Sequence, residues 1–314
     1  MTTRPLVDPQ IAPLLDMLPP LELSDEAIAG IREMLNAPPP DLPPCPLEPQ
    51  SRSAPGLDGA PDVPVLVFDP PGRTSKAAIY QIHGGGMVVG TAASGNLSNA
   101  ALALALGVVV VSVDYRLAPE NAFPAPQMDC LGGYDWLVAN ADELGIDPGR
   151  IAIFGESAGG CLAASLALMI RDTGRPAPCA QLLTYPMLDY RTGSDEYPAL
   201  PNTGEFVWTS AHNRYGWGAL KGEYGADDER IGWFSPAHAA DLSGLPPTWM
   251  AVGALDLFLA EDLDYAKRLV AAGVPVEAHV YPGCIHAFNM VPGARMADAY
   301  SRDLAEALKA FFGL

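Results

Sequence analysis

Short apolar runs rich in β-branched residues alternate along most of the chain with longer segments whose apolar positions recur at helical spacing. This alternation is typical of an α/β fold with a mostly parallel central sheet flanked by helices. The expected strands are Val65–Phe68, Ala77–Ile82, Val108–Val113, Ile151–Phe154, Ala180–Tyr185, Thr248–Val252 and Val276–Tyr281. The expected helices are Leu97–Leu106, Met128–Asn140, Ala158–Arg171, Ala260–Ala272 and Ala297–Phe312.

Two parts of the chain depart from this alternation. Residues 11–35 have the spacing of two short amphipathic helices, with Ser24 as an N-cap. The proline-rich stretch from Pro38 to Pro64 is interpreted as an extended connection. Residues 189–241, rich in glycine, proline and aromatic residues, are interpreted as an insertion whose aromatic side chains mostly pack its own core.

The chain has 314 residues and a net charge of −19. The length fits one main domain with an appendage, and the charge argues against nucleic acid because phosphate binding needs clustered Lys and Arg. The first residues are polar and interrupted by proline, and the longest apolar run, Ala100 to Val111, is too short to span a bilayer. We therefore expect a soluble, cytoplasmic protein with no membrane span.

The cysteines are odd in number, and none has Cys-x-x-Cys spacing. They are expected to be reduced and mostly buried thiols. The sequence contains no His-Glu-x-x-His motif and no cluster of Cys and His with metal-ligand spacing. We therefore predict neither a metal nor a cofactor.

An expected strand, a turn and an expected helix follow one another without a gap from Ile151 to Met169. The turn reads Gly155-Glu-Ser157-Ala-Gly159, the Gly-x-Ser-x-Gly pattern of a nucleophile elbow. A serine on so sharp a turn projects its hydroxyl away from the backbone, and the flanking glycines let the turn close. Ser157 is the predicted nucleophile, and a glycine-rich turn with an idle serine is the alternative.

A serine hydroxyl is a weak nucleophile at neutral pH, so it needs a base and a carboxylate that orients the base. His286 lies in the loop after the last expected strand, and this loop reaches the same sheet edge as Ser157. The nearby Cys284 is a rival nucleophile but has no elbow. His286 is therefore the predicted base.

The strand that begins at Thr248 ends at Asp256, which gives the chain order Ser, Asp, His that this architecture requires. Glu261, Asp262 and Asp264 compete on position. They follow a turn or more later, where they are expected to cap or decorate the next helix. Asp256 is therefore the predicted acid.

Three glycines, Gly84 to Gly86, follow His83 directly after an expected strand. Such a run lets the backbone N–H groups of Gly84 and Gly85 converge on a carbonyl oxygen, with Ala158 supplying a third donor. These amides are the predicted oxyanion hole. A phosphate-binding loop is disfavoured because no Lys-Ser/Thr follows, and His83 itself is expected to be structural.

The combination of motifs resembles the hormone-sensitive-lipase-like family of bacterial α/β-hydrolase carboxylesterases. The resemblance covers residues 77 to 288 and implies an α/β-hydrolase fold with a helical cap. It also implies hydrolysis of carboxylic esters through an acyl-enzyme on Ser157, without a cofactor. The matching residues are His83-Gly-Gly-Gly86, Asp114-Tyr-Arg-Leu-Ala-Pro-Glu120, Phe123-Pro-Ala125, Asp129, Gly155-Glu-Ser-Ala-Gly159, Asp256, Glu261 and His286.

Three positions depart from the family pattern. Leu257 and Ala260 stand where many members carry Pro and Asp, and Ala287 follows the histidine where Gly is usual. They affect loop shape more than the triad, so they bear on rate and specificity. Glu156, beside the nucleophile, resembles the acidic residue of the family's acidic-elbow subgroup.

The resemblance also implies a division of the chain. Residues 1–50 and 189–241 are expected to form the cap, and residues 51–188 and 242–314 the catalytic domain. We expect Tyr185, Phe206 and Trp208 to contact substrate, and a lid closing over a compact pocket favours short- to medium-chain acyl esters.

Other interpretations stay open at this point. The same triad would act on amide or thioester bonds in a pocket of suitable shape. A ligand-binding α/β-hydrolase without turnover is a second alternative, disfavoured by the complete set of catalytic motifs. The resemblance suggests a homodimer formed through Val276–Tyr281 and Ala297–Phe312, although an edge covered within one chain would give the same pattern.

Overall fold

The computed structural model describes residues 2–17, 21–37, 43–225 and 228–314. Its centre is an eight-stranded sheet with the order β1-β2-β4-β3-β5-β6-β7-β8. Strand β2 is antiparallel to both of its neighbours, and all strands from β4 to β8 pair in parallel. The strands are β1 Gln50–Ala54, β2 Val63–Phe68, β3 Ala78–Ile82, β4 Val109–Val113, β5 Ile151–Glu156, β6 Ala180–Thr184, β7 Thr248–Gly253 and β8 Val276–Tyr281.

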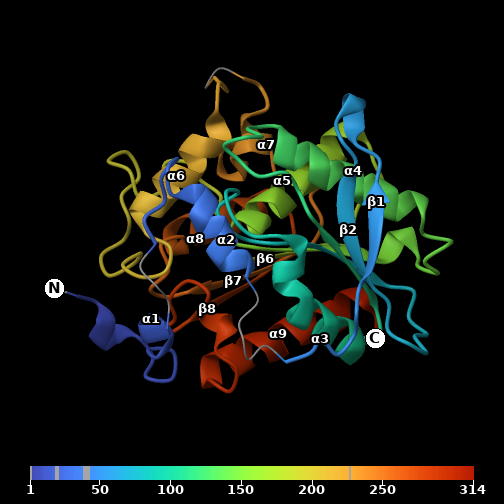
Figure 1. Ribbon diagram of the computed structural model, residues 1–314, viewed down its shortest axis with the longest axis horizontal. Coiled ribbons are helices and arrows are strands. Elements are labelled where there is room, and N and C mark those ends of the chain that lie inside the picture. The colour runs from blue at the N-terminus through green and yellow to red at the C-terminus, as the bar shows by residue number, and fades with distance from the viewer. Residues whose placement is uncertain (1, 18–20, 38–42, 226–227) are drawn as a thin grey trace.

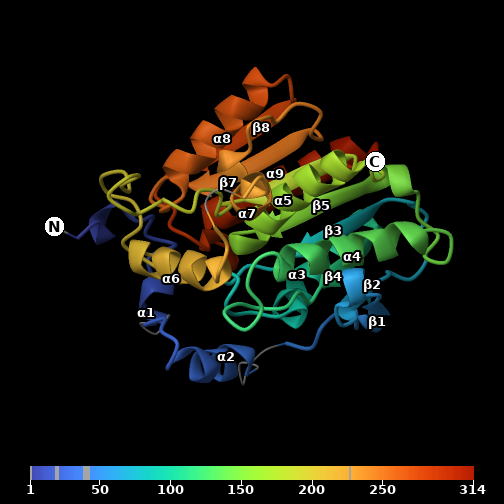
Figure 2. The same cartoon turned by 90° about the horizontal axis from the view of Figure 1, so that it is seen from above.

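Helices cover both faces of this sheet (Figures 1 and 2). The α-helices are α1 Leu14–Met17, α2 Ile28–Asn36, α3 Asn96–Leu106, α4 Ala125–Ala139, α5 Ala158–Thr173, α6 Ser210–Lys221, α7 Ile231–Phe234, α8 Leu259–Ala271 and α9 Arg295–Phe312. Short 3₁₀ helices lie at Arg4–Leu6, Leu57–Gly59, Ala92–Gly95, Pro148–Arg150, Pro236–His238 and Phe288–Met290. Every strand and helix expected from the alternation is present, which confirms the α/β class.

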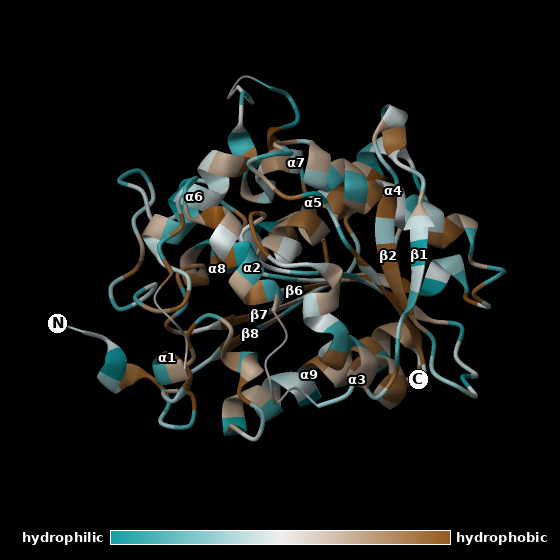
Figure 3. Ribbon diagram, in the orientation of Figure 1, coloured by the Kyte–Doolittle hydropathy of each residue, from teal (hydrophilic) through white to brown (hydrophobic). Residues whose placement is uncertain are grey.

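The sheet separates two hydrophobic cores. Side chains of successive strand residues point to opposite faces. In β4, Val109 and Val111 therefore belong to the core beneath α4, α5 and α8, whereas Val110 belongs to the core with α3 and α9. Because both faces are covered, the central strands are largely apolar, as the hydrophobic colouring in Figure 3 shows, with a few buried polar residues such as Gln81, Ser112 and Gln181.

Strand β1 was not among the strands predicted from the sequence. It lies within the stretch interpreted as an extended connection, of which residues 38–42 are outside the described part of the chain. The strand reads Gln-Ser-Arg-Ser-Ala and is exposed except at Ala54, so it carries no apolar alternation. It is an edge strand held by its antiparallel pairing with β2, and in Figure 3 it is visibly more hydrophilic than β2.

The N-terminal helices are present, and Ser24 makes the hydrogen bonds of an N-cap at the start of α2. Its Oγ accepts the N–H of Ala27 at 3.2 Å, and its carbonyl oxygen accepts the N–H of Ile28, the first residue of the helix, at 2.9 Å. Arg32 fixes α2 to the main domain, because its guanidinium donates to the carbonyl oxygens of Val88 and Ala118, each at 2.7 Å.

The insertion carries α6 and α7, and its aromatic side chains do not form a separate core. Tyr224 and Phe234 pack against Phe123 of the main domain, with ring centroids 4.7 and 5.5 Å away. Trp217 packs on Phe234 at 5.2 Å, and all four belong to the core beneath α4 and α5. The expectation of a self-contained core was wrong because two short helices bury too little apolar surface alone.

The glycines of the turn after β5 have no room for a side chain. A Cβ at Gly155 would overlap the carbonyl oxygen of Gly159, and one at Gly159 would overlap that of Ile82. We therefore expect Gly159→Ala to lower the free energy of unfolding by about 2 kcal/mol or more, measured by urea denaturation.

Gly218 is the matched control for this substitution. It lies inside α6 with open space around its Cα. Gly218→Ala should leave stability unchanged or raise it by up to about 1 kcal/mol, because alanine favours the helix. Equal effects of the two substitutions would contradict the packing argument.

Candidate active site

Ser157 occupies a strained turn between β5 and α5. Its backbone has φ 56° and ψ −119°, a conformation that non-glycine residues rarely adopt. Its N–H donates to the carbonyl oxygen of Thr184 at 2.9 Å, and its own carbonyl accepts the N–H of Met187 at 3.1 Å. The end of β6 and the segment after it thus hold the turn that presents the hydroxyl.

Three side chains predicted from distant parts of the sequence meet at this turn. His286 Nε2 lies 3.0 Å from Ser157 Oγ, and His286 Nδ1 lies 2.8 Å from Asp256 Oδ2. Because a carboxylate only accepts, Nδ1 carries the proton and Nε2 is left to accept from the serine hydroxyl. Ser157 and His286 are each 6 % exposed and Asp256 1 %, so this chain of hydrogen bonds is shielded from water.

The loops around Asp256 and His286 account for two of the departures from the family pattern. Asp256 Oδ1 accepts the N–H of Phe258 at 3.0 Å, so the carboxylate is oriented by its own loop even though Leu257 replaces the usual proline. Ala287 has φ 62°, a region that glycine adopts at lower cost. The more common glycine at this position is therefore explained by backbone geometry.

The glycine run lies directly beside the nucleophile. A Cβ on Gly84 would lie 3.4 Å from Ser157 Cβ, and Gly85 has φ 116° and no space for a Cβ against Val89. Among the hydrogen bonds of the described residues, none uses the N–H of Gly84, Gly85 or Ala158 as donor. Unpaired amides beside a serine hydroxyl are suited to negative charge.

His83 and Tyr115 support the glycine run from behind. His83 Nδ1 donates to the carbonyl oxygen of Gly84 at 2.8 Å, and Tyr115 OH donates to that of His83 at 2.9 Å. The two rings stack with centroids 4.2 Å apart. Burial lowers the pKa of His83 to about 4, so the ring is neutral at neutral pH. This geometry agrees with the structural role expected for His83.

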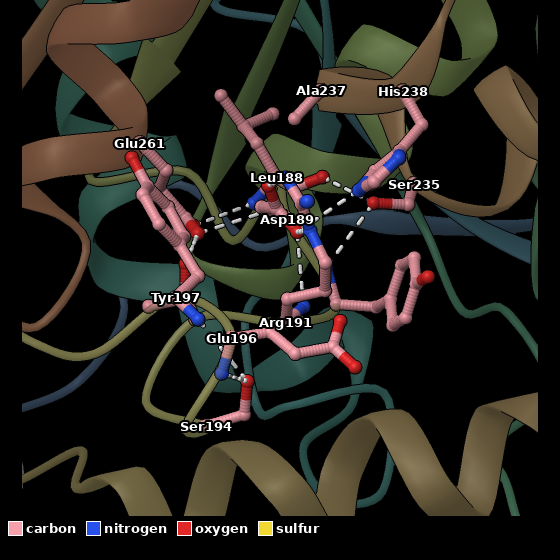
Figure 4. A network of polar contacts seen from close by, with 12 residues as sticks. Leu188, Asp189, Arg191, Ser194, Glu196, Tyr197, Ser235, Ala237, His238 and Glu261 are labelled. Atoms are coloured by element: carbon pink, nitrogen blue, oxygen red, sulfur yellow. Dashed lines mark hydrogen bonds and ion pairs between the residues drawn. The ribbon is translucent and has the colours of Figure 1, made fainter.

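The acidic residues after Asp256 have different surroundings from those expected. Glu261 is buried, and its carboxylate accepts the N–H of Leu188 at 2.8 Å, that of Asp189 at 3.2 Å, and the hydroxyl of Thr192 (Figure 4). It therefore anchors the first residues of the insertion rather than decorating α8. The expectation failed because nothing in the sequence pairs Glu261 with a loop so far away along the chain.

Asp189 is the second centre of this network (Figure 4). It forms an ion pair with Arg191 at 2.7 Å and accepts from His238 Nε2 at 3.0 Å. Burial opposes the charge, but the hydrogen bonds from His238 and Arg191 outweigh it and hold the pKa of Asp189 below its ordinary value. Both ends of the insertion are thus joined beside Glu261.

The three residues expected to contact substrate take different positions. The Trp208 ring packs on Gly86 and lies 6.5 Å from the His286 ring. Tyr185 is 4 % exposed and lies behind the base, with ring centroids 4.5 Å apart. Phe206 is partly buried against the core with α3 and α9, and its contact with substrate stays a prediction.

One polar residue near the base was missed. Asn289 donates from Nδ2 to Glu156 Oε1 at 2.8 Å and accepts the hydroxyl of Tyr185 on Oδ1 at 2.7 Å. Glu156, the acidic residue before Ser157, stood out in the sequence, so one partner of this contact could have been found. Nothing in the sequence marked Asn289.

The described residues contain no cluster of His, Cys, Asp and Glu able to hold a metal. Cys284 is buried, and desolvation raises the pKa of its thiol to about 12, which disfavours the thiolate that a cysteine nucleophile needs. No helix in the described part of the chain is long and apolar enough to cross a membrane.

The similarity of the chain to known proteins agrees with this geometry. Residues 79–290 match the model of a family described as having the alpha/beta hydrolase fold, and the chain belongs to this family. The match confirms the relationship expected from the motifs.

Several similar proteins are named esterases. The chain is 34% identical to carboxylesterase NlhH of Mycobacterium tuberculosis, over 96% of this chain and 95% of that protein. It is 32% identical to esterase LipI of the same species, over 94% and 92%. The solved structure of a bacterial heroin esterase superposes with a TM-score of 0.89 at 36% identity, covering 99% of both chains.

Asp262 permits a test of the buried charges beside the site. It is 3 % exposed, neither oxygen has a partner among the described residues, and burial, with Glu261 and Asp256 adding, raises its pKa well above the ordinary value. A raised folded-state pKa means that stability falls as pH rises above about 3.9, the ordinary Asp value, towards the folded-state pKa. Asp262→Asn should therefore gain about 1 kcal/mol or more relative to wild type between about pH 5 and pH 8, measured by urea denaturation.

Asp142→Asn is the control, because Asp142 is exposed. Its stability difference from wild type should stay constant over the same range. A constant difference for Asp262→Asn as well would show that this carboxyl group is equally ionised in the folded and unfolded protein.

Proposed function

We propose that the protein is a serine carboxylesterase that hydrolyses short- to medium-chain acyl esters, with Ser157, His286 and Asp256 as nucleophile, base and acid. The observation that carries this proposal is the continuous hydrogen-bond chain from Asp256 through His286 to Ser157, ending beside unpaired backbone amides. The esterase names of its relatives support the choice of bond.

In the first half of the reaction, His286 Nε2 takes the hydroxyl proton as Ser157 Oγ attacks the ester carbonyl carbon. The carbonyl oxygen becomes an oxyanion, which the N–H groups of Gly84, Gly85 and Ala158 stabilise by hydrogen bonds. The imidazolium then gives its proton to the leaving alkoxide, and the alcohol departs. The acyl group stays on Ser157.

In the second half, water loses a proton to His286 and attacks the acyl carbon through a second oxyanion. Collapse of this intermediate returns the proton to Ser157 Oγ and releases the carboxylic acid. Throughout the reaction, the contact of Asp256 with Nδ1 orients the ring and stabilises each transient imidazolium. No step requires a metal or a cofactor.

Trp208 supports a compact acyl site. Its ring lies on Gly86 and faces the region of His286, and its indole N–H donates to Asn213 at 3.2 Å, which fixes the ring. A fixed indole close to the nucleophile limits the length of acyl chain that fits, which favours short and medium chains.

The N-terminal residues 1–50 and the insertion 189–241 are proposed to form the cap, with the catalytic domain in residues 51–188 and 242–314. Two contacts between the described parts of these segments support their union. His212 Nε2 donates to the carbonyl oxygen of Leu21 at 2.7 Å, and Tyr215 OH donates to Asp25 at 3.1 Å. In both views α1 and α6 lie on the side of the molecule that carries the N-terminus, and α2 lies nearer the middle (Figures 1 and 2).

The other expectations stay predictions. Action on amide or thioester bonds uses the same triad, and the names of the relatives favour esters. The homodimer through β8 and α9 and the cytoplasmic location are untested.

Substitution of the nucleophile tests the reaction. Ser157→Ala should lower kcat on p-nitrophenyl butyrate by about 10³-fold or more, because no other group takes the acyl chain. It should also abolish labelling by a fluorophosphonate. Cys284→Ser is the control and should keep near wild-type activity, since burial disfavours the thiolate that a cysteine nucleophile needs. Full activity of Ser157→Ala would refute the mechanism.

A ladder of p-nitrophenyl esters from acetate to dodecanoate tests the pocket. Wild type should be fastest on butyrate or hexanoate, and Trp208→Ala should move the maximum by about two carbons or more towards longer chains. Trp233→Ala, which removes an indole bonded to Asp172, should leave the maximum in place. A wild-type maximum at decanoate or beyond would contradict the compact site.

A further inference from the structure

A polar chain connects the residue before the nucleophile with the ring behind the base. Asn289 donates to Glu156 Oε1 at 2.8 Å and accepts from Tyr185 OH at 2.7 Å. The Tyr185 ring lies against His286, with centroids 4.5 Å apart and planes at 55°. The catalytic proposal does not use Glu156 or Asn289.

The donors and acceptors of each group set the direction of these bonds. The amide nitrogen of Asn289 can only donate, so Glu156 accepts, and the amide oxygen can only accept, so Tyr185 donates. Tyr185 is 4 % exposed and has φ 36°, so its backbone is held in a strained position that aims the ring. Glu156 therefore anchors the ring that supports one side of His286.

Glu156 is also electrostatically coupled to His286. Desolvation raises the pKa of Glu156, while the Asn289 hydrogen bond and the nearby His286 oppose this rise by favouring the carboxylate. The interaction is mutual, because a carboxylate that is stabilised by an imidazolium stabilises that imidazolium equally. In a site shielded from water such a charge retains more of its effect than it would at the surface.

We propose that Glu156 is a positioning residue for the base: through Asn289 and Tyr185 it holds the His286 ring, and its charge is a second negative group that favours the imidazolium formed during ester hydrolysis. This inference rests on the proposed function. Asp256 contacts the His286 ring directly, whereas Glu156, at the end of β5, acts on the ring from further away.

Other groups around His286 must be considered in any pH experiment. The facing rings of Trp208 and Phe258 carry no charge. The titratable groups at or near the base are Asp256 from the loop after β7, Glu156 from β5, Tyr185 after β6, and, one layer further out, Asp262 on α8 and Tyr300 on α9.

The test compares charge with geometry in the purified full chain, using steady-state kinetics on p-nitrophenyl butyrate. Removing a negative charge lowers the pKa of an imidazole, and the base works unprotonated, so the acid limb of the pH profile moves to lower pH. Glu156→Gln should shift this limb of kcat/KM down by about 0.5 to 1 pH unit and lower kcat about 3- to 10-fold, with KM within about twofold. Glu156→Asp keeps the charge and should leave the acid limb near its wild-type position.

Asn289→Ala provides a second route to the same result. It removes the donor that favours the carboxylate and frees the Tyr185 hydroxyl, so it should reproduce the fall in kcat. Tyr281→Phe is the matched control, because it deletes a similar tyrosine contact, to Asp303 at 2.9 Å, in the same aromatic layer. Its kcat and pH profile should match those of wild type.

Thermal melting and fluorophosphonate titration of Ser157 establish that each variant is folded and count its competent sites. A folded Glu156→Gln with wild-type kcat and acid limb would overturn the inference, as would equal shifts for the Gln and Asp variants. If Glu156→Gln does not fold, an unchanged kcat in Asn289→Ala overturns it instead. In each case the proposed function stands if the wild-type protein is active and Ser157→Ala abolishes that activity.

Discussion

The tight turn at Ser157 is the constraint on which the rest of the structure depends. A serine with a positive φ between β5 and α5 is unfavourable on its own, so the surrounding structure must hold it in this conformation. Gly155 and Gly159 bring two backbone segments together without side chains, and Gly84 lets the neighbouring loop approach the nucleophile. The same close approach that creates the strain also brings the backbone amides to the hydroxyl. Packing and reactivity therefore have a common origin in this turn.

The parallel sheet turns this local geometry into a site. Strands β5, β7 and β8 end at one edge, so the loops after them reach one another although they are far apart in the sequence. The loop after β7 supplies Asp256, which accepts a backbone N–H of its own loop, and the loop after β8 supplies His286, whose ring contacts Asp256. The insertion is attached at the same edge by Glu261, whose carboxylate binds the backbone at Leu188. The reacting groups and the insertion are therefore attached to the same edge of the sheet.

The sequence allowed the sheet, its main helices and the meeting of Ser157 with its two partners to be predicted, because apolar periodicity and short motifs are local signals. The features it could not provide depend on contacts between distant segments. Strand β1 has no apolar pattern, and its pairing with β2 alone defines it. Asn289 is an ordinary polar residue until folding places it between Glu156 and Tyr185. The role of Glu261 was likewise invisible, since an acidic residue in a first helical turn usually faces solvent.

The low exposure of the reacting groups has a consequence for turnover. With Ser157 and His286 each only 6 % exposed, an ester must pass between neighbouring side chains to reach the hydroxyl. Where entry of the ester or exit of the acid requires these side chains to move, that step falls in the range of microseconds to milliseconds that active-site motions take in other enzymes. Solvent viscosity, which slows a moving segment but not a proton transfer, would then set the pace of a good substrate more than that of a poor one.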